Sequence, residues 1–343
     1  MALYAVDRID DAVDMTRSFL TPVETGRWGR LVVIVAFLLV GTGGGGASTA
    51  SNVPTTTGSV SGDVPAGTME LPDVSATAIA ILVGVFAVLL LLGLLAAAIG
   101  AIMEFVFVES LSNDEIHVRR YARRYAGKGL RLFAFRLLLG IVTVVILGAT
   151  VLLLFGDVIA AFLAGDVVAP SAGRLLAGVV LLGPFAVAVG TVVALANGFT
   201  TEFVVPIMLR EGRGVIAGWQ RLWPTLREQW TQYGAYVLIA FGLHIVTGIA
   251  GSILVGITAV ALALPFLLVA VPVGFGLLGG GTVTVGAIVL LGALVLVYVL
   301  VVFIAAAVIY VPITVFHRQF ALLVLGDTNS AFDVLTDRRP SAA

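Results

Sequence analysis

The feature that most constrains this sequence is a run of 89 residues, 229–317, without a single Asp, Glu, Lys or Arg. One transmembrane helix needs only about 20 apolar residues, so the run can hold more than one. The apolar run at 78–102 does not alternate apolar and polar residues, as the strands of a membrane barrel do. With 60% hydrophobic residues, the chain also exceeds the roughly 45–50% of soluble domains. The sequence therefore predicts an all-α, polytopic helical membrane bundle.

Hydropathy predicts six transmembrane helices, at 29–47, 77–103, 133–155, 174–200, 234–262 and 284–311. The first is short and runs into small residues, as a secretory signal does, but the 30 residues before its core are too long and too acidic for a signal. We expect it to be retained. The segment 264–281 is predicted to be re-entrant, or alternatively a distorted seventh span, because Pro265, Pro272 and several glycines interrupt a regular helix.

The distribution of basic residues predicts the orientation, because Lys and Arg near span ends stay in the cytoplasm. Eighteen of the 19 basic residues fall on one side of the six predicted spans, and Arg174 falls on the other. We therefore expect a multi-pass protein of the cell membrane with both termini in the cytoplasm. Residues 48–76 are rich in Ser, Thr and Gly and are predicted to form a flexible extracellular loop.

Short similarities at the inner ends of the predicted hairpins suggest an internal repeat. Residues 104–106 and 202–204 both read Glu-Phe-Val, and residues 205–207 and 311–313 both read Val-Pro-Ile. One interpretation is a single membrane domain of three parallel hairpin repeats, 1–131, 132–230 and 231–343, as in some transporters. The alternative is chance similarity between short apolar motifs.

A basic segment at 117–136 is predicted to bind anionic lipid headgroups. Its basic residues lie at helical spacing and include Arg119, Arg120, Arg123, Arg124 and Lys128. Nucleic acid also binds such a face, but here the segment joins two predicted spans, where the membrane surface attracts basic residues. The expected partners are therefore the lipid bilayer and its anionic headgroups, with no nucleic acid.

The stretch 202–230 is predicted to contain an amphipathic helix that lies on the cytoplasmic leaflet. After Gly214, apolar residues recur at three- and four-residue intervals, namely Val215, Trp219, Leu222, Leu226 and Trp230. Pro224 is expected to kink or restart this helix. Trp219, Trp223 and Trp230 are expected to bind at the lipid interface, as in an aromatic belt.

Four polar residues in or beside the spans form a possible polar site. Glu104 and Glu202 could act as a paired acid site, or each could reach the headgroups or pair with an arginine such as Arg210. His244 could relay protons, whereas a lone histidine in a span more often hydrogen-bonds a neighbouring helix. The same structural interpretation applies to Asn197.

No residue pattern points to catalysis. The chain has no cysteine, its three histidines lack the spacing of a metal site, and no nucleophile or phosphate-loop motif is present. We expect a non-enzymatic protein without metal or cofactor.

Several segments resemble an uncharacterised family of multi-pass membrane proteins of halophilic archaea: the leader at 5–20 and the segments 107–137, 202–230 and 310–327. The second half is more distantly similar to the membrane domain of glycerophosphodiester phosphodiesterases. The soluble barrel that carries out hydrolysis in those enzymes has no counterpart here, so the resemblance implies no catalytic residue.

These observations favour an integral membrane protein that acts as a scaffold or binds lipid or a protein partner. The alternatives are a transporter of small solutes or lipids built from hairpin repeats, and a membrane enzyme that acts on lipid headgroups.

Overall fold

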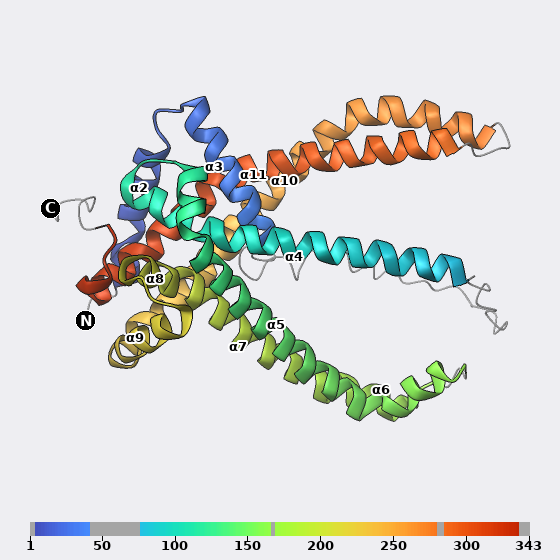
Figure 1. The fold of residues 1–343 in the computed structure, drawn as a ribbon, viewed down its shortest axis with the longest axis horizontal. Helices are drawn as coiled ribbons and strands as arrows, with labels where there is room; N and C mark the ends of the chain where they lie inside the picture. The colour runs from blue at the N-terminus through green and yellow to red at the C-terminus, as the bar shows by residue number, and fades with distance from the viewer. Residues whose placement is uncertain (1–3, 42–75, 166–168, 280–284, 336–343) are drawn as a thin grey trace. The chain divides into compact units, whose positions relative to one another are not determined.

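The computed structural model describes residues 4–41, 76–165, 169–279 and 285–335, and the regular structure of these residues is entirely helical (Figure 1). This confirms the predicted all-α class. The elements, in chain order, are α1 (Tyr4–Asp7), α2 (Ile9–Leu20), α3 (Thr25–Gly41), α4 (Ala76–Asn113), α5 (Val118–Leu163), α6 (Ala172–Ala177), the π-helix η1 (Gly178–Leu182), α7 (Gly183–Phe199), the π-helix η2 (Thr200–Val204), α8 (Val205–Glu211), α9 (Val215–Glu228), α10 (Trp230–Gly279), α11 (Val285–Thr328) and the 3-10 helix η3 (Ser330–Phe332).

Five helical stretches within the described residues are long and apolar enough to cross a membrane: Val83–Asn113, Val118–Leu163, Ala172–Glu211, Trp230–Phe275 and Val289–Thr328. The predicted first span falls on α3, whose 17 residues are fewer than the roughly 20 that a span needs. Residues 42–47 of that prediction, and all of the predicted extracellular loop at 48–76 except Ala76, lie outside the described residues.

Helix α10 corrects the predicted break after residue 262. It continues through Pro265 and Pro272 as far as Gly279, so no re-entrant loop is present over 264–279. Each proline removes one backbone hydrogen bond, but opening the helix in an apolar segment would leave several backbone groups unsatisfied. Continuing the helix is the less costly arrangement.

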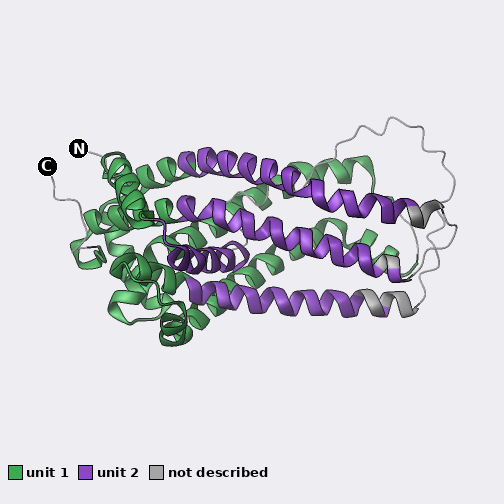
Figure 2. Cartoon of the chain, turned by 90° about the horizontal axis from the view of Figure 1, so that it is seen from above, with its two compact units in different colours: residues 1–22, 104–241, 315–343 green, residues 23–103, 242–314 purple. Residues whose placement is uncertain are grey.

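The chain divides into two compact units (Figure 2). Unit 1 comprises residues 1–22, 104–241 and 315–343, and unit 2 comprises residues 23–103 and 242–314. The core of unit 1 is built from the ends of the long helices, whose largest side chains there are almost completely buried: Phe105, Phe107, Phe203, Ile207, Tyr233 and Phe320. Unit 1 therefore gathers helix ends that lie far apart in the sequence.

The N-terminal helices belong to the same core as the C-terminal end of α11. The Arg8 guanidinium lies 2.7 Å from a carboxylate oxygen of Asp327, and the Thr16 hydroxyl donates to the Gln319 side chain at 2.8 Å. Hydrogen bonds to Asp327 and then Asp11 raise the pKa of Arg8 above its usual value. The two terminal segments of the described chain are thus held side by side in unit 1.

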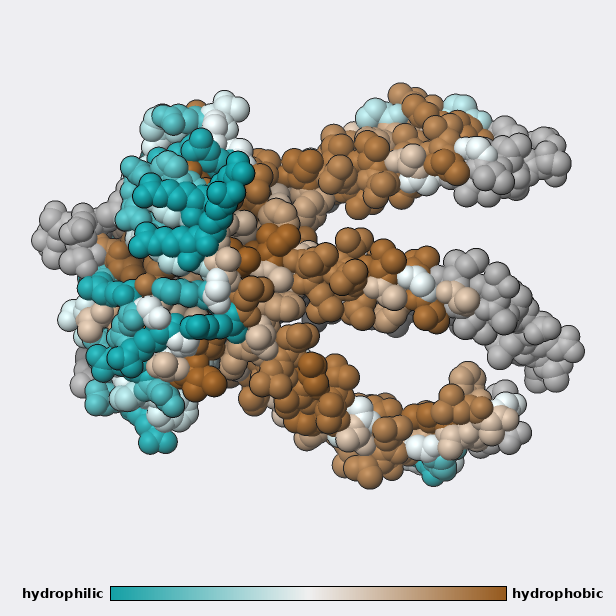
Figure 3. Space-filling model, viewed as in Figure 1, coloured by the Kyte–Doolittle hydropathy of each residue, from teal (hydrophilic) through white to brown (hydrophobic). Residues whose placement is uncertain are grey.

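Within unit 1, α5 and the α6–α7 segment form an antiparallel hairpin. Near its far end, Arg174 donates to both carboxylate oxygens of Asp157, at 2.6 and 2.8 Å, and Phe155 packs against Gly178. Figure 3 shows hydrophobic residues along most of the hairpin and hydrophilic residues gathered at the end where α8 and α9 lie. Its outward apolar side chains, such as Leu153 and Val179, suit a lipid environment.

Unit 2 contains a second antiparallel pair, made by α10 and α11. The Tyr298 hydroxyl donates to the Ala259 carbonyl at 3.0 Å, and its ring packs edge-on against Phe266. In the same unit, α3 approaches α4 so closely that a Cβ on Gly41 would lie 2.5 Å from the Gly100 Cα. Only glycine fits at this crossing.

Candidate functional site

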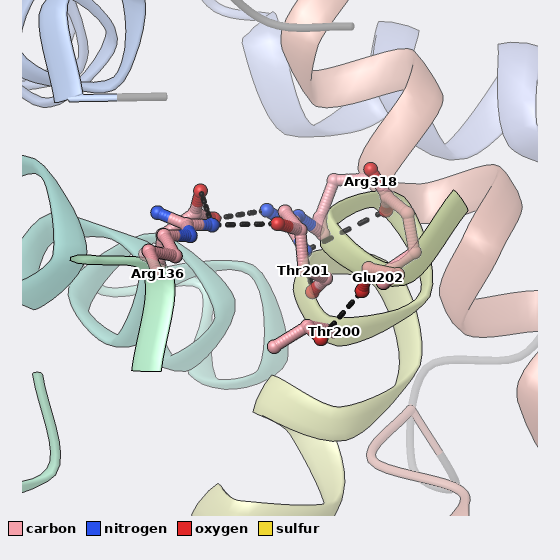
Figure 4. A network of polar contacts seen from close by, with 7 residues as sticks. Arg136, Thr200, Thr201, Glu202 and Arg318 are labelled. Atoms are coloured by element: carbon pink, nitrogen blue, oxygen red, sulfur yellow. Dashed lines mark hydrogen bonds and ion pairs between the residues drawn. The ribbon is translucent and has the colours of Figure 1, made fainter. Parts of the chain in front are cut away.

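Four charged side chains meet in the core of unit 1 (Figure 4). Glu104 comes from α4, Arg136 from α5, Glu202 from η2 and Arg318 from α11. Arg318 forms an ion pair with Glu104 and lies 3.5 Å from Glu202. Arg136 lies 3.2 Å from the other oxygen of Glu104 and donates to the Thr201 hydroxyl at 2.6 Å. We call these four residues the charge cluster.

The charge cluster is buried at its centre and electrically balanced. The side chains of Glu104 and Arg318 are only 1% and 4% exposed. Two carboxylates and two guanidinium groups cancel, so each buried charge has a partner that offsets the cost of removing it from water. The geometry therefore suits a clamp that fixes four helices against one another.

Local backbone geometry explains why Arg318 binds at this point of η2. In the π-helical register, the Val205 N–H donates to the Thr200 carbonyl, five residues earlier. The next bond in that register would join Pro206 to Thr201, but proline has no N–H. The Thr201 carbonyl instead accepts a hydrogen bond from Arg318 Nη1 at 2.5 Å. Because Pro206 has no N–H, the Thr201 carbonyl is left without a backbone donor and can accept from Arg318.

Helix α9 packs directly beside the charge cluster. The Trp219 indole N–H donates to the Thr200 hydroxyl at 3.0 Å, and a Cβ on Gly218 would lie 2.7 Å from Val204. Trp219 therefore faces the protein and is half-buried. The sequence predicts that Trp219 binds at the lipid interface, but its indole N–H is already engaged by Thr200.

The predicted apolar stripe of α9 is divided between two surfaces. Val215 and Leu222 are buried, whereas Trp230 begins α10 and is 71% exposed. Trp223 is 47% exposed and stacks with Arg227. The expectation that Pro224 restarts the helix is wrong, because α9 continues to Glu228. Gln220, whose carbonyl loses its donor at Pro224, is exposed to solvent.

The first turns of α5 separate a buried aromatic face from a basic outer face. Tyr121 and Tyr125 are buried. The exposed residues on the other side are Arg119, Arg120, Arg123 and Arg124, as expected for a surface that meets headgroups. Lys128 differs, because its ammonium donates to the carbonyls of Met208 and Leu209 at 3.0 and 3.4 Å. It caps the C-terminal end of α8.

Two of the four residues of the predicted polar site meet within unit 1. Glu104 and Glu202 meet through Arg318, whereas His244 lies half-buried on α10 in unit 2. Asn197 lies half-buried on α7, one turn before Thr201. The interpretation that the glutamates pair with arginine is confirmed, but the partners are Arg136 and Arg318 rather than the suggested Arg210.

Sequence reasoning missed both arginines of the charge cluster. The sequence places both among the 18 basic residues on one side of the predicted spans, and Arg136 also at the end of the basic segment 117–136. A signal was present for Arg318, which is the first charged residue after the 89-residue run. It continues the helix of that run, and its charge therefore needs a partner in the protein.

The comparison with protein families gives a match that covers nearly all of the chain. A family model matches residues 3–335. The chain belongs to the family of unknown function DUF7544. No curated protein and no solved structure matches it. This family member is a helical membrane protein, and its described residues hold no group of three or more His, Asp or Glu placed to bind a metal ion.

Proposed function

We propose that this chain is a non-enzymatic protein of the cell membrane whose cytoplasmic face binds anionic lipid headgroups. The observation that carries the proposal is the outer face of α5. Arg119, Arg120 and Arg123 are exposed there and make no ion pair with any residue that the structure describes. Arg124, the fourth arginine of this face, has its guanidinium 4.0 Å from a carboxylate oxygen of Glu109.

This basic face is unfavourable for an isolated helix. Arg119 and Arg123, like Arg120 and Arg124, are four residues apart, and like charges at this spacing repel. They also lie at the N-terminal end of α5, where the helix dipole disfavours cations. An anionic membrane surface offsets both effects and contributes about 1 kcal/mol per basic residue.

Helix α9 supports the same proposal with a different kind of side chain. Ile216, Trp223 and Trp230 are exposed in unit 1, and Arg227 stacks on Trp223. Tryptophan beside arginine suits the boundary between headgroups and acyl chains. The two surfaces together would hold unit 1 against the cytoplasmic leaflet.

The proposal includes six crossings with both termini in the cytoplasm. The chain leaves the core of unit 1 along α5 and α10, and it returns along α4, α7 and α11. Because α1 and α2 belong to that same core, we infer one further outward crossing before α4. We assign it to the segment between α2 and α4, which contains α3.

The alternative of a transporter that uses Glu104, Glu202 and His244 has less support. Both carboxylates are engaged by arginines, and Glu104 is almost completely buried. In the proposed function the charge cluster is a structural clamp.

The test compares two double variants of the full chain with equal loss of charge. Arg120→Gln with Arg123→Gln removes part of the α5 face, and Arg17→Gln with Arg213→Gln removes two exposed arginines elsewhere in unit 1. Native mass spectrometry of the detergent-purified protein measures its affinity for phosphatidylglycerol and phosphatidylcholine. At about 1 kcal/mol per residue, the first variant should lose roughly 30-fold in preference for phosphatidylglycerol, and the second should keep it. An unchanged preference in the first variant rejects the proposal.

A further inference from the structure

A polar pocket in unit 1 lies apart from the charge cluster. Its volume is about 340 Å³. The polar residues that line it come from three helices and are Glu109, Ser112, Asn113, Arg124, Tyr125 and Arg210. The volume is at the small end of the roughly 300–1,000 Å³ range of ligand sites, so it suits a headgroup or a small solute rather than an acyl chain.

The cations of this pocket outnumber its acids. Arg124 and Arg210 reach it from α5 and α8, and Glu109 is the one carboxylate among its lining residues. The 4.0 Å between Arg124 and Glu109 is too long for a hydrogen bond. Arg210 has no ion pair among the residues for which the structure gives a position.

A third cation lies beside the pocket without lining it. The Lys128 ammonium is 5.3 Å from the centre of the Tyr125 ring, and the Arg124 guanidinium is 5.5 Å from it. Tyr125 is buried and lines the pocket, and the Lys128 ammonium near its ring also donates to two carbonyls of α8. The local charge therefore favours an anion.

We propose that this pocket binds a phosphate group, carried by a lipid headgroup or by a soluble phosphoester. Guanidinium groups from two helices match the oxygens of a phosphate, and the Asn113 amide can donate a further hydrogen bond, whereas the Ser112 hydroxyl already donates to the Glu109 carbonyl at 3.0 Å. If the phosphate belongs to a lipid, the inference rests on the proposed function and adds a specific site to the diffuse attraction of α5. A soluble phosphoester would bind independently of it.

Calorimetric titration of the full-length protein in detergent tests the pocket. The probes are sodium phosphate, glycerol 3-phosphate, dihexanoyl phosphatidylglycerol and, as the ligand without phosphate, dihexanoylglycerol. Arg210→Gln should weaken phosphate-dependent binding at least tenfold, and Arg124→Gln should act in the same direction. Arg213→Gln, an exposed arginine that does not line the pocket, should change it less than twofold.

The outcomes separate the two sources of phosphate and the two proposals. Binding of sodium phosphate and glycerol 3-phosphate identifies a soluble ligand, whereas binding of phosphatidylglycerol alone identifies a headgroup. If no phosphate probe binds, or if Arg210→Gln and Arg124→Gln bind as the unsubstituted protein does, the pocket proposal is overturned. Loss of lipid preference in the Arg120/Arg123 variant with no effect of Arg210→Gln would leave the proposed function standing and reject the pocket.

Discussion

Arg318 is the residue on which the charge cluster depends most. It pairs with Glu104, lies 3.5 Å from Glu202 and donates to the Thr201 carbonyl. Removing it would leave a carboxylate that is almost completely buried with Arg136 as its remaining partner. Two carboxylates would then share one guanidinium, and the cost of this excess negative charge, more than the lost attraction, determines the effect of a substitution.

Arg318→Met should therefore lower the free energy of unfolding by about 3–5 kcal/mol. Adding Glu104→Gln removes the stranded charge, so the double variant should be more stable than the sum of the single effects predicts. Denaturant titration in detergent micelles measures all three variants. Strictly additive effects would contradict the clamp, and Arg17→Met, at an exposed position, should have an effect near zero.

At the residue scale, the sequence identified the two glutamates and misassigned their partners. Glu104 was recognisable because a carboxylate in an apolar helix needs a compensating group. Its partners, Arg136 and Arg318, are 32 and 214 positions away. No local pattern encodes such pairings, because they depend on how the helix ends converge.

At the scale of elements, the contact of α9 with η2 depends on a glycine, Gly218, which has no side chain. A Cβ at Gly218 would come within 2.7 Å of Val204, which is completely buried. The close approach also brings Trp219 within hydrogen-bonding distance of Thr200. A larger residue at 218 would separate α9 from the charge cluster.

Gly218→Val should therefore destabilise the protein by about 1–3 kcal/mol, the usual cost of overpacking. Gly127→Val is the matched control, because position 127 is exposed on α5 and nothing lies within 4 Å of its added Cβ. Thermal unfolding followed by tryptophan fluorescence compares the two. Equal melting temperatures would show that α9 does not need this contact.

Helix type was predictable from the sequence, whereas some helix limits were not. Apolar periodicity identified α9, but its breaker residue Pro224 proved compatible with the helix. The same is true of Pro265 and Pro272 in α10. A proline removes one backbone hydrogen bond from a helix. The surrounding structure determines whether the helix ends there or continues.

At the scale of the whole molecule, the proposed topology can be tested by labelling single introduced cysteines. The protein contains no cysteine, so any introduced thiol is a unique reporter. Ser18→Cys and Ser330→Cys lie in the terminal segments of unit 1, and Ala172→Cys lies near the far end of the α5–α7 hairpin. All three positions are exposed.

In intact cells, a membrane-impermeant maleimide should label Ala172→Cys and leave the other two unlabelled until the membrane is permeabilised. Labelling of only one of the two terminal positions in intact cells would contradict the even number of crossings. The basic residues predict the orientation, and the contact between Arg8 and Asp327, 319 residues apart in the chain, supports the proposed even number of crossings.

The ion pair near the far end of the α5–α7 hairpin has a consequence for biosynthesis. In the proposed orientation, Arg174 is the one basic residue that must be carried outward across the membrane. Moving a single positive charge against a potential of 100 mV costs about 2.3 kcal/mol. Arg174 Nη1 donates to both carboxylate oxygens of Asp157, at 2.8 and 2.6 Å, so the pair can pass as a neutral unit. The membrane potential then exerts little net force on the hairpin as it inserts.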